Sequence, residues 1–325
     1  MTNYCSLAIA FGISIESLRE EIKNQYDNYI QLESNVGFVD YRKVLGDNPD
    51  NIKDTKYGNN NVIGPGKENA FHGTYVAGII AQKRNNNIGG DGIANNVEIL
   101  TVRAVPDGDE YDKDIALGIR YAVDNGAKII NASFSKSYSP HKEWVYDAIK
   151  YAEKKDVLIV HAAGNGAKDI DVEHDFPNYS DNKKMEFVDN VITVGALNYK
   201  YGENVANDYS NYGKLNVDVL APGVKIYAAL PGNNYGFLPR TFMASPNVAG
   251  VAALIRSYYP KLSAAQVKRI IMESGIALEI KVKGNPSNKQ FFSELSKSGR
   301  IVNAYNALKM AEQLSKNPKN LNIKG

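Results

Sequence analysis

Hydrophobic residues in the middle of the chain gather in short, almost uninterrupted runs. Five such runs are rich in Val and Ile and have the length of strands: Val97–Val105, Ala127–Phe134, Val157–Gly164, Val191–Leu197 and Val217–Gly223. Uninterrupted runs of this kind are typical of strands that are buried on both faces of a parallel sheet. A further apolar run, Cys5–Ile13, predicts one more strand near the N-terminus.

The stretches between these runs have the spacing of helices. Apolar residues recur every three to four positions in residues 113–126 and 141–156, and Gly126 stands where a glycine C-cap belongs. Two more helices are predicted over Phe71–Ala81 and Met243–Tyr258. Strands that alternate with helices predict an α/β fold, a doubly wound, mostly parallel sheet flanked by helices on both faces. Such sheets bind ligands beyond the carboxyl ends of their strands.

Composition excludes several classes of function. The 325 residues are 43% hydrophobic, which is ample for a buried core. Because 38 Lys and Arg residues nearly balance 36 Asp and Glu residues, the net charge of +2 predicts neither nucleic acid nor anionic membrane as a partner. Since no run of about 18 apolar residues occurs, we expect no membrane span. A single cysteine, Cys5, excludes an internal disulfide.

Unusual polar residues stand at the predicted strand ends. Asn165 follows one strand, Ser133 and Ser135 close another, and His72 opens a helix. Taken singly, these residues have ordinary interpretations. A histidine at a helix start is more often structural than catalytic, and an asparagine after a strand usually forms a turn.

Taken together, six segments resemble the subtilisin-like serine proteases, the subtilase family. HGTYVAGIIA resembles its histidine element, IINASFS its substrate strand and AAGN its oxyanion asparagine, while the other three are VDVLAPGVKIYAALPG, the serine element TFMASPNVAGVAALI and the closing segment SGRIVNAYNAL. They follow the family order, and the spacings from histidine to asparagine (165 − 72 = 93) and from asparagine to the nucleophile position (242 − 165 = 77) suit it. The resemblance covers about Gly64 to Leu308.

The resemblance assigns roles to individual residues. It makes His72 the general base and Asn165 the side-chain donor to the tetrahedral oxyanion. It also implies that an extended polypeptide binds by strand addition. The residues assigned to that edge are Ser133, Phe134, Ser135 and Gly164, with Ser135 where the family usually has glycine.

The nucleophile position departs sharply from the family. The family pattern is Gly-Thr-Ser-Met-Ala, whereas this chain has Arg240 in place of the glycine and Phe242 in place of the serine. A phenyl ring has no lone pair for attack on a carbonyl, and in subtilisin loss of the serine costs on the order of a million-fold in turnover. Neither Thr241 nor Ser245 is expected to replace it, because the first points away from the site and the second is expected to be buried.

The aspartate that should orient His72 is also missing from its expected setting, because Ala10 stands at the acidic position of the run before Gly12. Asp40, 72 − 40 = 32 residues before the histidine, is an alternative, although Tyr41 and Arg42 follow it. A third alternative is an aspartate element upstream of this chain.

A helical insertion is predicted over Ile15–Leu32, where Ser17 and Glu20 resemble a capping box. We therefore divide the chain into residues 1–63, with the N-terminal strand and this insertion, a subtilase-like core of residues 64–310, and a polar tail of residues 311–325.

No metal or other cofactor is expected. The acidic turn that holds Asp107, Asp109 and Asp112 could bind calcium, but a solvated turn before a helix N-terminus is the commoner arrangement. The four histidines have no zinc-ligand spacing.

Three functions remain open. The first is a subtilase homologue that is inactive as a peptidase but binds extended peptides. The second is a serine endopeptidase that is disabled here by a substitution or a missing segment. The third, a small-molecule-binding doubly wound protein, is disfavoured because no glycine-rich phosphate motif follows an early strand. The family resemblance favours an extracellular or cell-envelope location, although the N-terminus lacks the basic flank and cleavage pattern of a secretory signal.

Overall fold

The computed structural model describes residue 42 and residues 45–105, 110–180, 186–283 and 289–316. The chain divides into two compact units, of which the first comprises residues 1–49 and 54–58 and the second residues 50–53 and 59–325. In the first unit, Arg42 forms an ion pair with Asp47 at 2.6 Å and lies over the ring of Tyr57 at 5.7 Å. The sheet and the named helices belong to the second unit.

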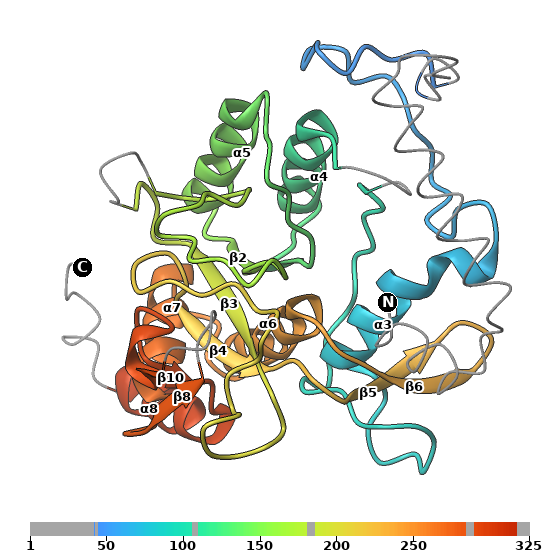
Figure 1. Ribbon diagram of the computed structural model, residues 1–325. Helices are drawn as coiled ribbons and strands as arrows, with labels where there is room; N and C mark the ends of the chain where they lie inside the picture. Colours follow the sequence, from blue (N-terminus) through green and yellow to red (C-terminus); the bar gives the residue numbers. More distant parts are fainter. Residues whose placement is uncertain (1–41, 43–44, 106–109, 181–185, 284–288, 317–325) are drawn as a thin grey trace, which may run out of the picture. The chain divides into compact units, whose positions relative to one another are not determined.

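Six strands form the main sheet, in the order β1-β2-β3-β4-β10-β7 (Figure 1). Their bounds are β1 Ile129–Ala132, β2 Leu158–Ala162, β3 Val191–Leu197, β4 Val219–Pro222, β10 Arg300–Ile301 and β7 Ile276–Ala277. All neighbouring pairs are parallel except β10 and β7, which are antiparallel. The carboxyl ends of β1 to β4 therefore meet at one edge, where the sequence places its polar residues.

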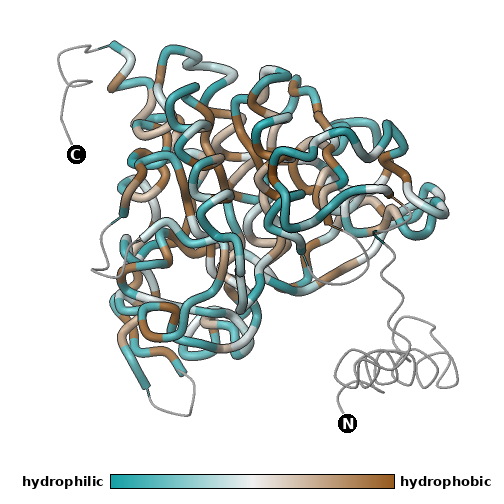
Figure 2. The backbone as a smooth tube through the Cα atoms, turned by 90° about the horizontal axis from the view of Figure 1, so that it is seen from above, coloured by the Kyte–Doolittle hydropathy of each residue, from teal (hydrophilic) through white to brown (hydrophobic). Residues whose placement is uncertain are grey.

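Helices cover both faces of this sheet, as predicted. On one face lie α4 (Asp112–Asp124) and α5 (Lys142–Lys154), and on the other α6 (Thr241–Tyr258), α7 (Ala264–Ser274) and α8 (Ala304–Lys316). Side chains alternate along β2, so that Leu158 and Val160 pack toward α6 while Ile159 packs toward α4 and α5. In Figure 2 the hydrophobic stretches of the backbone, coloured brown, accordingly lie mostly among the packed helices and strands.

The remaining elements lie beside or after this core. They are α3 (Phe71–Ala81), the hairpin of β5 (Ile226–Leu230) and β6 (Asn234–Leu238), the hairpin of β8 (Lys281–Lys283) and β9 (Lys289–Phe291), and the 3-10 helices η2 (Lys67–Ala70) and η3 (Phe292–Glu294). Helix α3 packs on α6 and on the first hairpin through Tyr75, Ile79 and Met243. No helix in the described ranges combines the length and the hydropathy that a membrane span requires.

One predicted strand is wrong. Residues 97–105 form no strand, and Ile99 and Leu100 are 45% and 44% exposed. A hydrophobic run becomes a strand only when a neighbouring strand pairs with it, and within the described part of the chain β1 pairs with β2 alone. The predicted strand Cys5–Ile13 and helix Ile15–Leu32 lie outside the described residues.

The glycine C-cap predicted at Gly126 is observed. Helix α4 stops at Asp124, and Gly126 follows at φ +87°, with its N–H donated to the carbonyl of Val123 at 3.1 Å. This is the left-handed conformation that glycine adopts without steric cost after a helix. Residues 311–316, which the sequence assigns to the polar tail, instead belong to α8, which runs to Lys316 with Ala311 fully buried.

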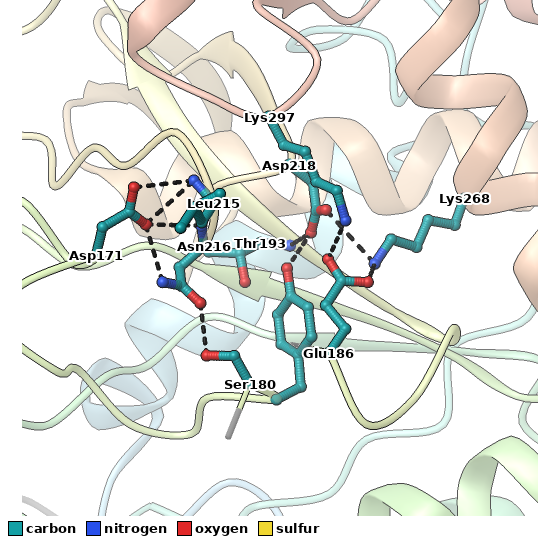
Figure 3. Close-up of polar contacts among 10 residues, drawn as sticks. Asp171, Ser180, Glu186, Thr193, Leu215, Asn216, Asp218, Lys268 and Lys297 are labelled. Atoms are coloured by element: carbon teal, nitrogen blue, oxygen red, sulfur yellow. Dashed lines mark hydrogen bonds and ion pairs between the residues drawn. The ribbon is translucent and has the colours of Figure 1, made fainter. Parts of the chain in front are cut away.

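A buried network of charged side chains joins the sheet to α7 (Figure 3). Asp218, at the start of β4, is fully buried and accepts hydrogen bonds from the N–H of Thr193 at 2.8 Å and from the hydroxyl of Tyr179. Lys268 of α7 lies 3.4 Å from Asp218 and 2.9 Å from Glu186. Although burial acts to lower the pKa of Lys268, the two carboxylates raise it, so the ammonium stays charged.

Candidate active site

A hydrogen bond joins the first turn of α6 to the end of β1, at a carbonyl that a proline leaves without its helical partner. Pro246 has no N–H, so it cannot donate the helical hydrogen bond to the carbonyl of Phe242. The hydroxyl of Ser133, directly after β1, donates to that carbonyl instead, at 2.8 Å. Ser133 Oγ also lies 2.8 Å from Ser245 Oγ and from Nδ2 of Asn131. This bond positions residue 242 against the predicted peptide-binding edge.

Ser133 therefore contributes to that edge differently from the other three predicted residues. Its side chain is buried and points toward α6, which leaves only its backbone for contact with a peptide.

Asn165 follows β2 and is oriented by α6. Its Oδ1 accepts two hydrogen bonds from Thr241, one from the N–H and one from the hydroxyl, both at 2.9 Å. Because the oxygen is used in this way, the Nδ2 amide is the group left to donate to an oxyanion. The arrangement suits the role that the family resemblance assigns to Asn165.

The two hydroxyls nearest position 242 are engaged in the scaffold. Thr241 is fully buried and its hydroxyl is bonded to Asn165, while Ser245 is fully buried and its hydroxyl is bonded to Ser133. Ser245 is thus buried, as expected from the sequence. Each hydroxyl is hydrogen-bonded to a partner other than His72, whereas a serine-type nucleophile is activated by an adjacent base.

His72, in the first turn of α3, lies beside Phe242. The two rings are in edge contact, with centroids 5.9 Å apart and planes inclined by 83°. Burial lowers the pKa of His72 below its usual 6.5, so the imidazole is neutral at neutral pH. Its Nε2 is buried and has no hydrogen-bond partner within the described residues. A neutral ring with an unpartnered nitrogen is the state of a base, but the group beside it has no proton to give.

Arg240 adopts a backbone conformation that is normal only for glycine. Its φ of 154° and ψ of 166° lie in a region where a Cβ atom is strained. The backbone N–H of Arg240 donates to the carbonyl of Gly223 at 2.8 Å, and its guanidinium lies over the ring of Tyr209 at 5.5 Å. The glycine that the family has at this position would adopt the same backbone without strain.

The predicted peptide-binding edge has an ordered backbone. The carbonyl of Phe134 accepts a hydrogen bond from Nε2 of the buried His161 at 3.0 Å. Two residues after it, Lys136 forms an antiparallel bridge with Phe176, with hydrogen bonds of 3.0 and 2.7 Å. Gly164, at φ +96°, carries the second side of the edge.

Two residues that sequence analysis missed hold this second side. Asn211 donates from Nδ2 to the carbonyl of Ala163 and to Asp175, each at 2.8 Å. Its Oδ1 accepts the N–H groups of Gly166 and Lys168, both at 2.9 Å. No motif marks Asn211 or Asp175, because the side-chain contacts of Asn211 are with residues at least 36 positions away and one of them is its bond to Asp175.

The remaining candidates can be placed only in part. Ala10, which stands at the expected acidic position, and the alternative Asp40 lie outside the described residues, as do Asp107 and Asp109 of the acidic turn. Asp112 is described, and its two oxygens are occupied by Lys136 at 2.8 Å, by Ser139 at 2.6 Å and by the N–H of His141 at 2.8 Å. A carboxylate that is already paired with an ammonium is a poor calcium ligand.

Comparison with known proteins matches this geometry to one family. The model of the subtilase family matches residues 15–299. A thermophilic serine proteinase of Bacillus sp. (strain AK1) is 42% identical over 187 residues, which cover 57% of this chain and 42% of that protein. Subtilisin-like protease 1 of Plasmodium falciparum is 32% identical over 274 residues, which cover 78% of this chain and 38% of that protein. The chain thus spans about two fifths of the length of these relatives.

Solved structures agree with the sequence matches. The structure of the subtilase cytotoxin SubAB assembly matches 78% of this chain and 80% of its own, with a TM-score of 0.61 and 25% identity. A protease of Pseudoalteromonas arctica matches 74% of this chain and 70% of its own, with a TM-score of 0.59 and 28% identity. With the doubly wound sheet, the matched family model and these relatives in agreement, the chain belongs to the subtilase family, a family of serine proteases.

Proposed function

We propose that this chain is a subtilase homologue that does not hydrolyse peptide bonds and that binds an extended polypeptide. The observation that carries the proposal is the contact between His72 and Phe242, whose ring centroids are 5.9 Å apart. The family resemblance assigns the nucleophile to position 242, and a phenyl ring there cannot form the acyl-enzyme bond.

The ring also affects what chemistry could remain. Loss of the nucleophile alone would leave about a thousandfold acceleration over water from the oxyanion site and from substrate binding. Because the ring of Phe242 lies against His72, it takes up space beside the base, and we expect it to keep a water molecule from taking the place of the missing hydroxyl. We therefore expect no measurable turnover of peptides.

Peptide binding makes no use of the missing hydroxyl. A peptide that adds to the edge as a strand is held by main-chain hydrogen bonds, and the backbone of this edge is fixed by His161 at Phe134 and by Asn211 at Ala163. Rigid backbone lowers the entropic cost of ordering the site when a peptide binds. An extended polypeptide is accordingly the partner that we propose.

A second candidate is a serine endopeptidase that a substitution has disabled. The bonds between Asn165 and Thr241 support it, because they leave Nδ2 of Asn165 to serve an oxyanion. In that case His72 and Asn165 keep their roles and the nucleophile is missing. Restoring the hydroxyl would then restore chemistry.

A fluorophosphonate probe, which reacts with activated serine hydroxyls, separates these candidates. The unmodified chain is compared with Phe242→Ser, and Phe242→Ala serves as the control because it removes the ring without supplying a nucleophile. Labelling of the unmodified chain at the site would overturn the inactive assignment. Labelling of Phe242→Ser but not of Phe242→Ala would show that His72 and Asn165 remain competent. Titration of the unmodified chain with extended peptides tests the second half of the proposal, which fails if no saturable binding is found.

A further inference from the structure

Asp175 lies where the two sides of the peptide-binding edge converge. A Cβ atom built on Gly164 would lie 2.3 Å from Oδ2 of Asp175 and 3.0 Å from Oγ of Ser135. The carboxylate therefore occupies the space that a side chain at position 164 would take, and the hydroxyl of Ser135 approaches the same point. Only glycine at position 164 leaves room for it.

This carboxylate has no countercharge within the described residues. Its Oδ1 accepts the N–H of Phe176 at 3.1 Å, and its Oδ2 accepts Nδ2 of Asn211 at 2.8 Å. Both donors are neutral, and an ionised carboxylate has about four acceptor positions. Half of its hydrogen-bonding capacity is therefore left for another group.

The nearest charged residues do not neutralise it. Lys168 favours the ionised form of Asp175, but its ammonium lies 3.4 Å from Ser137 and 3.6 Å from Glu173 instead. Glu110 acts in the opposite direction, because its negative charge disfavours a second one nearby. Partial burial is the largest effect and raises the pKa of Asp175 to about 6. A partly buried carboxylate of this kind gains more from a cation than an exposed one does, since water screens the pair less.

We propose that Asp175 receives a lysine or arginine side chain of the bound peptide, so that the site selects extended peptides that carry a basic residue. The inference rests on the proposed peptide binding and names the class of peptide. A purely structural role, in which Asp175 only holds Asn211, requires no charge, because a neutral amide oxygen would accept the same bond. Charge is thus the property on which the two interpretations differ.

The experiment compares two fluorescent, end-blocked hexapeptides by anisotropy at pH 8, where Asp175 is ionised. One has a single arginine among alanines, and the other has citrulline, which keeps the shape of arginine but is neutral. They are titrated against the unmodified chain, against Asp175→Asn, and against Glu173→Gln, which removes a nearby exposed carboxylate outside the edge. Circular dichroism checks that each variant is folded.

We expect the unmodified chain and Glu173→Gln to bind the arginine peptide at least about tenfold more tightly than the citrulline peptide. In Asp175→Asn this ratio falls to about one, and affinity for the citrulline peptide is retained. Equal affinities for the two peptides in the unmodified chain would overturn the inference while leaving peptide binding intact, and so would an undiminished ratio in Asp175→Asn. If the unmodified chain binds neither peptide, the proposed function fails together with the inference.

Discussion

Lowering the pH from 7 to 5 is expected to destabilise the protein through His161, which lies on β2 and is only 3% exposed. Its Nε2 is 3.0 Å from the carbonyl of Phe134, so this nitrogen carries the proton and donates it. Its Nδ1 is buried and has no partner in the described part of the chain. A second proton on Nδ1 would therefore be placed where nothing can accept it.

The magnitude follows from the pKa of His161. Burial lowers this pKa from 6.5 to about 4, whereas the unfolded chain keeps the ordinary value. Because the unfolded state takes up the proton first, stability is lost as the pH falls from 6.5 toward 4. The full difference corresponds to about 3.4 kcal/mol, of which about 2 kcal/mol is lost by pH 5.

Urea denaturation at pH 7 and pH 5 measures this loss, with His161→Gln as the matched variant. Glutamine can still donate to the carbonyl of Phe134, but it does not titrate. His72 titrates in both proteins, so its contribution cancels in the comparison. We expect the free energy of unfolding of the unmodified chain to fall by about 2 kcal/mol more than that of His161→Gln. An equal fall in both proteins would refute the reasoning.

Three further predictions concern the scaffold, each measured as a free energy of unfolding in urea. Arg240→Gly is expected to be about 1–2 kcal/mol more stable than Arg240→Ala, because only glycine is unstrained at φ 154°, and an alanine variant of equal or greater stability would contradict this. Ser133→Ala is expected to lower the free energy of unfolding by about 1–3 kcal/mol, since it leaves the carbonyl of Phe242 in the first turn of α6 unpaired. An unchanged free energy of unfolding would mean that a water molecule replaces the hydroxyl of Ser133. Lys268→Met is expected to lower the free energy of unfolding by about 3–5 kcal/mol, because it leaves the buried Asp218 without its cation. Lys297→Met, at a side chain that is 44% exposed, is expected to lower it by less than about 1 kcal/mol. Similar losses in the two variants would show that burial of the ion pair does not determine its contribution.

The parts of the fold that the sequence predicts are those where burial alone determines the pattern. Residues 157–164 and 191–197 are almost entirely hydrophobic because β2 and β3 lie between two layers of helices. Residues 97–105 have the same pattern but no strand, because pairing depends on a neighbour that a local pattern does not reveal. Hydrophobicity thus predicts burial more directly than it predicts pairing.

The residues of the candidate site also fall into two groups, those that a local motif identifies and those that no motif identifies. His72, Asn165 and Phe242 stand inside local motifs, so their positions can be found from the sequence, and the structure brings His72 next to Phe242. Asp175 and His161 stand in no motif. The environment of each arises from segments that only the folded chain brings together, and burial then sets the charge state of each side chain.

The bond from Ser133 to the carbonyl of Phe242 holds the main chain at position 242 without using the side chain found there. Because Pro246 deprives that carbonyl of its helical partner, the support comes from another element and is the same for any residue at 242. A different side chain at position 242 would leave this bond in place, so we expect the main chain here to keep its position in Phe242→Ser.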